Sequence, residues 1–152
     1  AANYNAPGQV VIAGETDAVH AAIEACKAAG AKRAVRLDVS GPFHSRLMAR
    51  AADDFSEALS AIVLTLPEIP VYQNVHGQVA GSVDEMRKLL VQQLYSPVRW
   101  TTCVGALLDG GVGQFVECGP GSVLAGLVKR ISRGTPTVGL STAAGIEAAQ
   151  AL

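Results

Sequence analysis

Charged and aromatic residues are scarce in this sequence. Of its 152 residues, 16% are charged and 5% are aromatic, whereas 49% are hydrophobic, and the net charge is -1. Acidic and basic side chains are interspersed, so the sequence shows neither the basic surface of a nucleic-acid-binding protein nor a polybasic membrane patch. The apolar content is too high for a disordered chain and predicts one buried core.

Long apolar runs are also absent. The longest, such as residues 21–23 and 123–128, fall far short of the roughly 20 residues that cross a bilayer. The first residue is alanine, and neither a charged leader nor a signal-type apolar stretch follows it, which we interpret as a cut or truncated start. We therefore expect a cytoplasmic protein that does not span membranes.

Cysteine is rare as well. The three cysteines, Cys26, Cys103 and Cys118, are widely spaced, and no two of them form a C-x-x-C pair. An odd number of scattered cysteines predicts neither a disulfide framework nor a zinc cluster. A reducing compartment fits this usage, and we expect no metal site.

What is present is a regular alternation of strand and helix patterns. Short β-branched or alternating runs predict strands over residues 10–13, 33–39, 69–75, 114–117 and 137–140. Helical spacing and terminal signals predict helices over residues 16–30, 45–62, 82–94, 97–108 and 122–131. This order is typical of an α/β fold with a mainly parallel sheet and flanking helices.

The clearest boundary is the Ser-Gly-Pro-Phe turn at residues 40–43, which separates a small lobe, residues 1–40, from a larger part, residues 41–152. His44 follows this turn and directly precedes a helical pattern. The positive end of that helix disfavours an imidazolium and keeps the ring neutral, as a general base must be. A lone histidine at a helix start is also commonly a capping or surface residue, so these observations alone leave both interpretations open.

Four segments carry motifs that belong together. They are NYNAPGQVVIAG at residues 3–14, VSGPFHS at 39–45, QLYSPVRW at 93–100 and ECGPG at 117–121. In this order they resemble the malonyl-CoA:acyl carrier protein transacylases, over essentially the whole chain. The resemblance implies part of a small ferredoxin-like lobe, residues 1–40, and the carboxy-terminal part of a large α/β-hydrolase-like acyltransferase core, residues 41–152, with His44 in the cleft between them.

The resemblance also implies a reaction: transfer of a malonyl group from malonyl-CoA to the phosphopantetheine thiol of acyl carrier protein, through a seryl ester and without a cofactor. His44 would be the general base and acid, and the backbone carbonyl of Gln93 would accept its other ring N–H. The family's serine, in a G-H-S-x-G elbow, and its carboxylate-binding arginine belong to an amino-terminal half that this sequence lacks. No G-x-S-x-G occurs here, because the Gly-Pro-Gly-Ser-Val run ending at Val123 has the wrong spacing. We therefore expect this chain alone to be inactive.

Four more residues are candidate substrate contacts. Asn3, Asn5 and Gln9 lie in the first motif, where they either line the acyl or CoA cleft or make local turns, which is their commonest role. Phe43, beside His44, resembles the bulky residue that narrows the acyl pocket and favours malonyl over methylmalonyl units. Its alternative is a position in the core.

Two other functions stay open at this point. The first is a non-catalytic docking module for acyl carrier protein, which requires that no serine-bearing companion segment exists. The second is a thiol acyltransferase in which Cys118 is the nucleophile and His44 its base, because Cys118 lies where a strand meets a helix start, a position that can activate a thiol. The Gly-Pro-Gly turn after Cys118 lacks the length and the lysine of a phosphate-binding loop, so we interpret it as structural.

Overall fold

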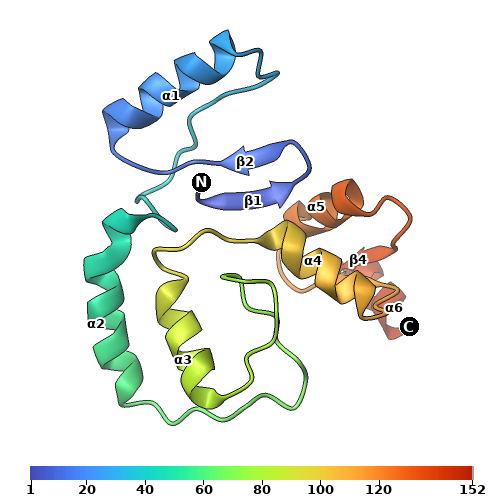
Figure 1. Cartoon of the computed structure of the whole chain (residues 1–152). Helices are drawn as coiled ribbons and strands as arrows, with labels where there is room; N and C mark the ends of the chain where they lie inside the picture. Colours follow the sequence, from blue (N-terminus) through green and yellow to red (C-terminus); the bar gives the residue numbers. More distant parts are fainter. Residues whose placement is uncertain (152) are drawn as a thin grey trace.

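The computed structural model describes residues 1–151, in which helices and strands are combined in an α/β fold (Figure 1). The strands are β1 (Asn3–Ala6), β2 (Gln9–Val11), β3 (Phe115–Glu117) and β4 (Thr137–Gly139). The helices are α1 (Thr16–Ala28), α2 (Ala49–Ser60), α3 (Val83–Gln92), α4 (Trp100–Asp109), α5 (Val123–Ile131) and α6 (Ala143–Gln150), and a short 3₁₀ turn, η1 (Arg46–Met48), precedes α2. Within residues 1–151, no helix has the length and apolar character needed to cross a membrane.

The strands form two separate two-stranded sheets. β1 and β2 are an antiparallel hairpin whose turn passes through Gly8, where φ is 74° and a side chain would be strained. β3 and β4 are parallel and are connected through α5. The prediction of a mainly parallel sheet is therefore correct for β3 and β4 and wrong for the hairpin. Because its Asn-Tyr-Asn segment is polar, β1 was not predicted from the sequence, and neither was the tight turn that pairs it with β2.

Two predicted strands do not form. Residues 33–39 have no regular structure, and residues 69–75 contribute only an isolated β-bridge. The apolar side chains that were expected on one face of the first segment, Val35, Leu37 and Val39, are 52%, 50% and 63% exposed. Alternation marks a segment that is able to pair, but a strand needs a neighbour to take its N–H and C=O groups. No strand within residues 1–151 provides that neighbour.

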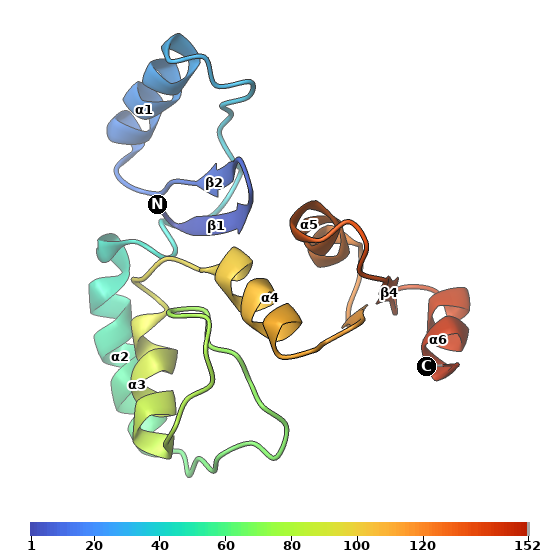
Figure 2. The ribbon, with the colours of Figure 1, turned by 45° about the vertical axis from the view of Figure 1, so that its right-hand side comes forward.

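Helices α2 and α3 lie side by side and run in opposite directions (Figures 1 and 2). α3 buries Met86 and Leu89 at the centre of a hydrophobic cluster. On its other flank, the guanidinium of Arg87 donates to the carbonyl groups of Leu59 and Ile62 at the end of α2. The start of α2 therefore lies beside the end of α3.

Local signals set the helix ends as predicted for α3. Ser82 Oγ accepts the N–H of Glu85 at 3.1 Å, which confirms the serine cap of the predicted capping box, whereas the Glu85 carboxylate accepts the N–H of Gly81, the residue before the N-cap, at 2.7 Å. α6, which the sequence pattern did not predict, begins in a related way, because Thr142 Oγ1 accepts the N–H of Gly145 at 3.1 Å. A polar cap therefore starts each of these two helices.

Helix α4 contacts both the hairpin and α5, which also contact each other (Figure 2). Its inner face is deeply buried, with Val104 at 0% and Cys103 at 4% exposure. Just before the helix, Val98 forms a parallel bridge with Asn3 of β1. α4 thereby connects the hairpin to the parallel strand pair.

Candidate functional site

His44 lies between the turn at residues 40–43 and η1, beside the end of α3. Its backbone φ is 61°, and within residues 1–151 it is the one non-glycine residue with a positive φ; this left-handed region holds only a few per cent of non-glycine residues. Its N–H donates to the carbonyl of Leu94 at 3.0 Å, and its Nδ1 lies 2.7 Å from the carbonyl oxygen of Gln93. His44 therefore contacts two successive carbonyl groups at the end of α3, one through its backbone and one through its ring.

The end of α3 provides these acceptors for a general reason. The last carbonyl groups of an α-helix have no partner within the helix and carry the negative end of its dipole. Here the carbonyls of Val91 and Gln92 accept the N–H groups of Leu94 and Tyr95, both at 3.2 Å, which leaves the next two carbonyls to His44. Because a carbonyl only accepts, Nδ1 must hold the ring proton, and the lone pair of the neutral imidazole is then on Nε2. In this tautomer, Nε2 is the ring nitrogen that can accept a proton as a general base does.

Nε2 of His44 forms no hydrogen bond within residues 1–151, neither with its two neighbours in the sequence nor with any other residue. Ser45 Oγ instead donates to the carbonyl of Pro42 at 2.6 Å and accepts the N–H of Leu47 at the start of η1. Phe43 is 49% exposed and is therefore not in the core that the described residues form. The described residues thus hold an oriented imidazole with no hydroxyl group bonded to it.

One residue of this group was missed by sequence reasoning. Asn74 Nδ2 donates to Oε1 of Gln93 at 3.2 Å, and the carbonyl of Asn74 accepts the N–H of Arg99 at 2.9 Å. Asn74 precedes Gln93 by 19 residues and lies in a segment that was predicted as a strand. No motif or spacing in the sequence links the two, so only the folded chain brings them together.

The three polar residues of the first motif lie elsewhere. Asn3 is in β1, where its backbone pairs with β2 and with the segment before α4. The side chain of Gln9 accepts a hydrogen bond from Arg130 of α5 at 2.5 Å. Within residues 1–151, no hydrogen bond joins Asn3, Asn5 or Gln9 to His44. Their predicted place in a substrate cleft stays a prediction.

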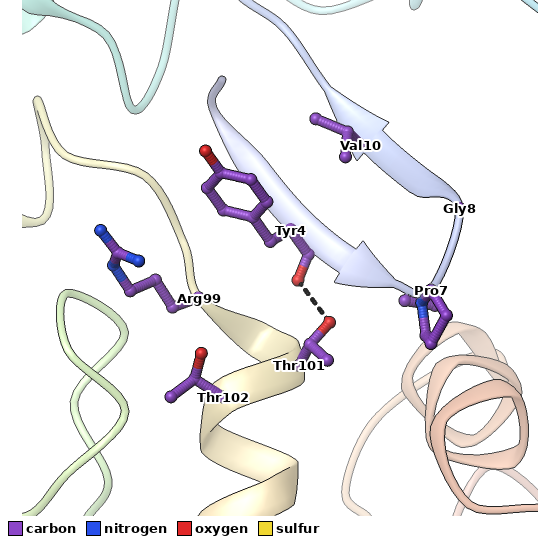
Figure 3. A pocket seen from close by; sticks show the side chains of 8 residues that line it. Tyr4, Pro7, Gly8, Val10, Arg99, Thr101 and Thr102 are labelled. Carbon is purple, nitrogen blue, oxygen red and sulfur yellow. Dashed lines mark hydrogen bonds between the residues drawn. The ribbon is translucent and has the colours of Figure 1, made fainter.

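An open hollow of about 350 Å³ lies between the hairpin and the start of α4 (Figure 3). The guanidinium carbon of Arg99 lies 5.9 Å from the ring centroid of Tyr4, and Thr101 Oγ1 donates to the carbonyl of Tyr4 at 3.1 Å. Arg99 is the one charged residue of its lining, and neither His44 nor Gln93 takes part in it. This hollow is therefore separate from the imidazole site.

The Gly-Pro-Gly turn before α5 is closed by a carboxylate. Glu117, the last residue of β3, accepts the N–H groups of Leu124 and Ala125 at 3.0 and 2.9 Å. These are the free donors at the start of α5 that a bound phosphate would use. A structural role of the turn follows, in agreement with the prediction.

The cysteines differ in environment. Cys118 is exposed and forms no hydrogen bond with His44, whereas Cys103 is buried and its thiol lies 3.7 Å from the carbonyl of Gln73. Burial raises the pKa of the Cys103 thiol above its ordinary value. Within residues 1–151, no three histidine, cysteine or carboxylate side chains gather in a way that could hold a metal ion.

Comparison with known proteins gives a consistent picture. A family model described as acyl transferase domain matches residues 1–147. The malonyl CoA-acyl carrier protein transacylase of Bacillus subtilis is 45% identical over 148 residues, which are 97% of this chain and 47% of the relative. The crystal structure of a malonyl-CoA:acyl carrier protein transacylase from Xanthomonas oryzae pv. oryzae superimposes with a TM-score of 0.94 at 44% identity, covering 97% of this chain and 47% of that one.

A further similar structure contains a partner. It is a malonyl-transacylase in complex with a type II polyketide synthase acyl-carrier protein, with a TM-score of 0.94 and 48% identity. The match covers 97% of this chain and 48% of that one. In each of these comparisons the chain spans about half the length of the protein that it matches.

Proposed function

This chain belongs to the acyl transferase domain family, and we propose that it is the histidine-bearing part of a malonyl-CoA:acyl carrier protein transacylase. The observation that carries the proposal is the 2.7 Å contact between Nδ1 of His44 and the carbonyl oxygen of Gln93. It prepares Nε2 to accept a proton, which is the requirement for activating a hydroxyl nucleophile. The relatives' shared activity supplies the substrates: malonyl-CoA and acyl carrier protein.

The proposed reaction has two balanced steps. In the first, Nε2 of His44 takes the proton of a serine hydroxyl, the serine oxygen bonds to the malonyl carbonyl carbon, and the carbon–sulfur bond of malonyl-CoA breaks. The departing CoA sulfur takes the proton back from the imidazole. In the second step, the phosphopantetheine thiol of acyl carrier protein gives its proton to His44 and attacks the seryl ester, and the serine oxygen leaves with that proton. No cofactor takes part in the proposed reaction.

The end of α3 takes the place that a carboxylate has in the usual triad. While His44 is protonated, both ring nitrogens carry protons, and the Gln93 carbonyl accepts the one on Nδ1. A main-chain acceptor with a fixed direction thereby selects the tautomer and keeps its hydrogen bond while the ring is protonated.

The serine and the arginine for the malonyl carboxylate are proposed to lie on a companion segment, the amino-terminal half of the same enzyme. The chain spans about half the length of its relatives, and its apolar stripe at Val35, Leu37 and Val39 is at least half exposed. Soluble chains rarely leave such a row of apolar side chains in water. A companion that pairs with residues 33–39 would complete the strand that the alternation predicts and cover this stripe.

The finer predictions from the sequence are kept as part of the proposal. Residues 1–40 belong to a small ferredoxin-like lobe and residues 41–152 to a hydrolase-like core, although Leu152 lies outside the described residues. Phe43 is exposed next to His44, where it can narrow an acyl pocket, and Asn3, Asn5 and Gln9 contact substrate. The enzyme is proposed to act in the cytoplasm, in fatty acid biosynthesis.

Mass spectrometry of the purified protein tests the proposal. The intact mass under denaturing conditions shows whether a companion segment accompanies the 15.6 kDa chain, and incubation with malonyl-CoA shows which species gains a malonyl group. We expect the malonyl group on a serine of the companion segment. His44→Ala should slow acylation by about 10²- to 10⁴-fold, and His20→Ala, in the exposed part of α1, should not change it.

Two results would contradict this function. If the 15.6 kDa chain is the only species and never gains a malonyl group, a docking module for acyl carrier protein becomes the better interpretation. If the malonyl group is instead found on Cys118, the thiol mechanism replaces the seryl one.

A further inference from the structure

We propose that Asn74 is a positioning residue of this site: its side chain holds Gln93 so that the Gln93 carbonyl keeps facing Nδ1 of His44. The inference rests on the proposed function and adds a residue that lies outside all four sequence motifs. Asn74 acts through Gln93, because its own hydrogen bonds go to Gln93 and Arg99 and not to the imidazole.

Gln93 needs such support because of its place in the helix. It is the C-cap residue of α3, just beyond the last helical residue Gln92, and its N–H donates to Leu89 at 3.0 Å while its carbonyl lies outside the helical ladder. Terminal turns fray readily, and a rotation of the peptide group after Gln93 would turn the carbonyl away from the ring of His44. A second attachment through the Gln93 side chain opposes that rotation.

Asn74 is a firm anchor because it belongs to a tight turn fastened to α4. Its carbonyl accepts the N–H of Arg99, directly before α4, at 2.9 Å. The preceding residue, Gln73, is 8% exposed, its N–H donates to Gln78 at 2.8 Å, and its carbonyl accepts the N–H of Gly77 at 2.8 Å. The hydrogen bond from Asn74 to Gln93 thus connects the end of α3 to a turn that is itself held at the start of α4.

This geometry gives Asn74 a measurable effect on the protons of His44. With the Gln93 carbonyl in place, the neutral ring carries its proton on Nδ1. If the carbonyl becomes mobile, part of the preference is lost and the Nε2–H tautomer gains population, in which Nε2 has no lone pair for a nucleophile's proton. A residue that only stabilised the turn would leave the tautomer ratio unchanged.

Nitrogen-15 NMR of the full chain tests this, because the chemical shifts of the two ring nitrogens report which one is protonated. The chain has three histidines, and the His44 signals are assigned by replacing His20 and His76 in turn with glutamine. At about pH 8.5, where a free imidazole is neutral, we expect Nδ1–H to predominate. Asn74→Ala should lower the ratio of Nδ1–H to Nε2–H by about two- to tenfold, the range set by one neutral hydrogen bond.

A second substitution tests the same contact from its other end. Gln93→Met keeps the length of the side chain and the backbone carbonyl but removes the amide, so it should lower the ratio as much as Asn74→Ala. The double variant should fall no further than either single one, because both remove a single interaction. Gln78→Ala is the matched control: Gln78 lies in the same turn and is exposed, and we expect it to leave the ratio unchanged.

The outcomes separate this inference from the proposed function. If Asn74→Ala or Gln93→Met, with the spectrum of a folded chain, keeps the ratio of Gln78→Ala, Asn74 has no positioning role even where malonyl transfer is observed. Additive effects of the two substitutions would overturn it as well. If the ratio changes as expected but no malonyl group is ever transferred, the proposed function fails and the role of Asn74 in orienting His44 stands.

Discussion

Gly77→Ala should destabilise the chain because it drives the Asn74-bearing turn away from α4. A Cβ at this position would lie 2.6 Å from Cγ2 and 2.9 Å from Cβ of Thr102, well inside van der Waals contact. The φ of Gly77 is 75°, and an L-residue with a side chain adopts this left-handed conformation at a cost of about 1–2 kcal/mol. Overpacking adds about 1–3 kcal/mol, so the free energy of unfolding should fall by roughly 2–5 kcal/mol.

A matched glycine separates the two contributions. Gly111 also has a positive φ, 88°, but a Cβ there would meet no atom within 4 Å. Gly111→Ala should therefore lower the free energy of unfolding only by the cost of the left-handed conformation, about 1–2 kcal/mol. Thr102→Ala removes the Cγ2 atom that the new Cβ would meet. In the Gly77→Ala background it should therefore raise the free energy of unfolding by about 1 kcal/mol, because residues in contact are energetically coupled. The same Thr102→Ala change should not help Gly111→Ala.

Urea unfolding followed by the fluorescence of Trp100, the one tryptophan of the chain, measures these differences by linear extrapolation. Trp100 lies in the first turn of α4, two residues before Thr102, so it reports on the helix concerned. If the free energy of unfolding falls no more for Gly77→Ala than for Gly111→Ala, the close approach of the turn to α4 is refuted.

Two further predictions concern the second half of the chain. Glu117→Ala removes the acceptor of the Leu124 and Ala125 N–H groups, so the unfolding free energy should fall by about 1–2 kcal/mol, as for other helix caps; hydrogen exchange of these two amides should accelerate, and unchanged exchange would rule out the cap. Burial raises the pKa of the Cys103 thiol, so the folded chain keeps that proton at pH values where the unfolded chain has lost it. Stability should therefore fall as the pH rises above about 8.5, and Cys103→Ala should remove this part of the pH dependence, which urea titrations at several pH values would detect.

The sequence by itself determined the features that depend on neighbouring residues. Helix ends are one example: the serine cap of α3 needs only a hydroxyl three residues before the N–H that it accepts, and the hydrogen bond between Ser82 Oγ and the N–H of Glu85 forms as predicted. The motif around His44 is another, because four motifs in a fixed order identify the family without any coordinates. The polar segment with Asn3 and Asn5 was not predicted as a strand, since its pairing as β1 depends on a hairpin partner and not on its own pattern.

Only the tertiary structure decided how distant parts of the chain meet. His44 and Gln93 are 49 residues apart, and the antiparallel packing of α2 on α3 brings the ring to the free carbonyls. The place of Asn74 could not be read from the sequence, because nothing in its surroundings there refers to Gln93. Residues 33–39 show the converse: their alternation is that of a strand, yet pairing requires a second strand, and within residues 1–151 none is adjacent. Local patterns set which elements can form, whereas long-range hydrogen bonds and packing determine which of them do and what they hold in place.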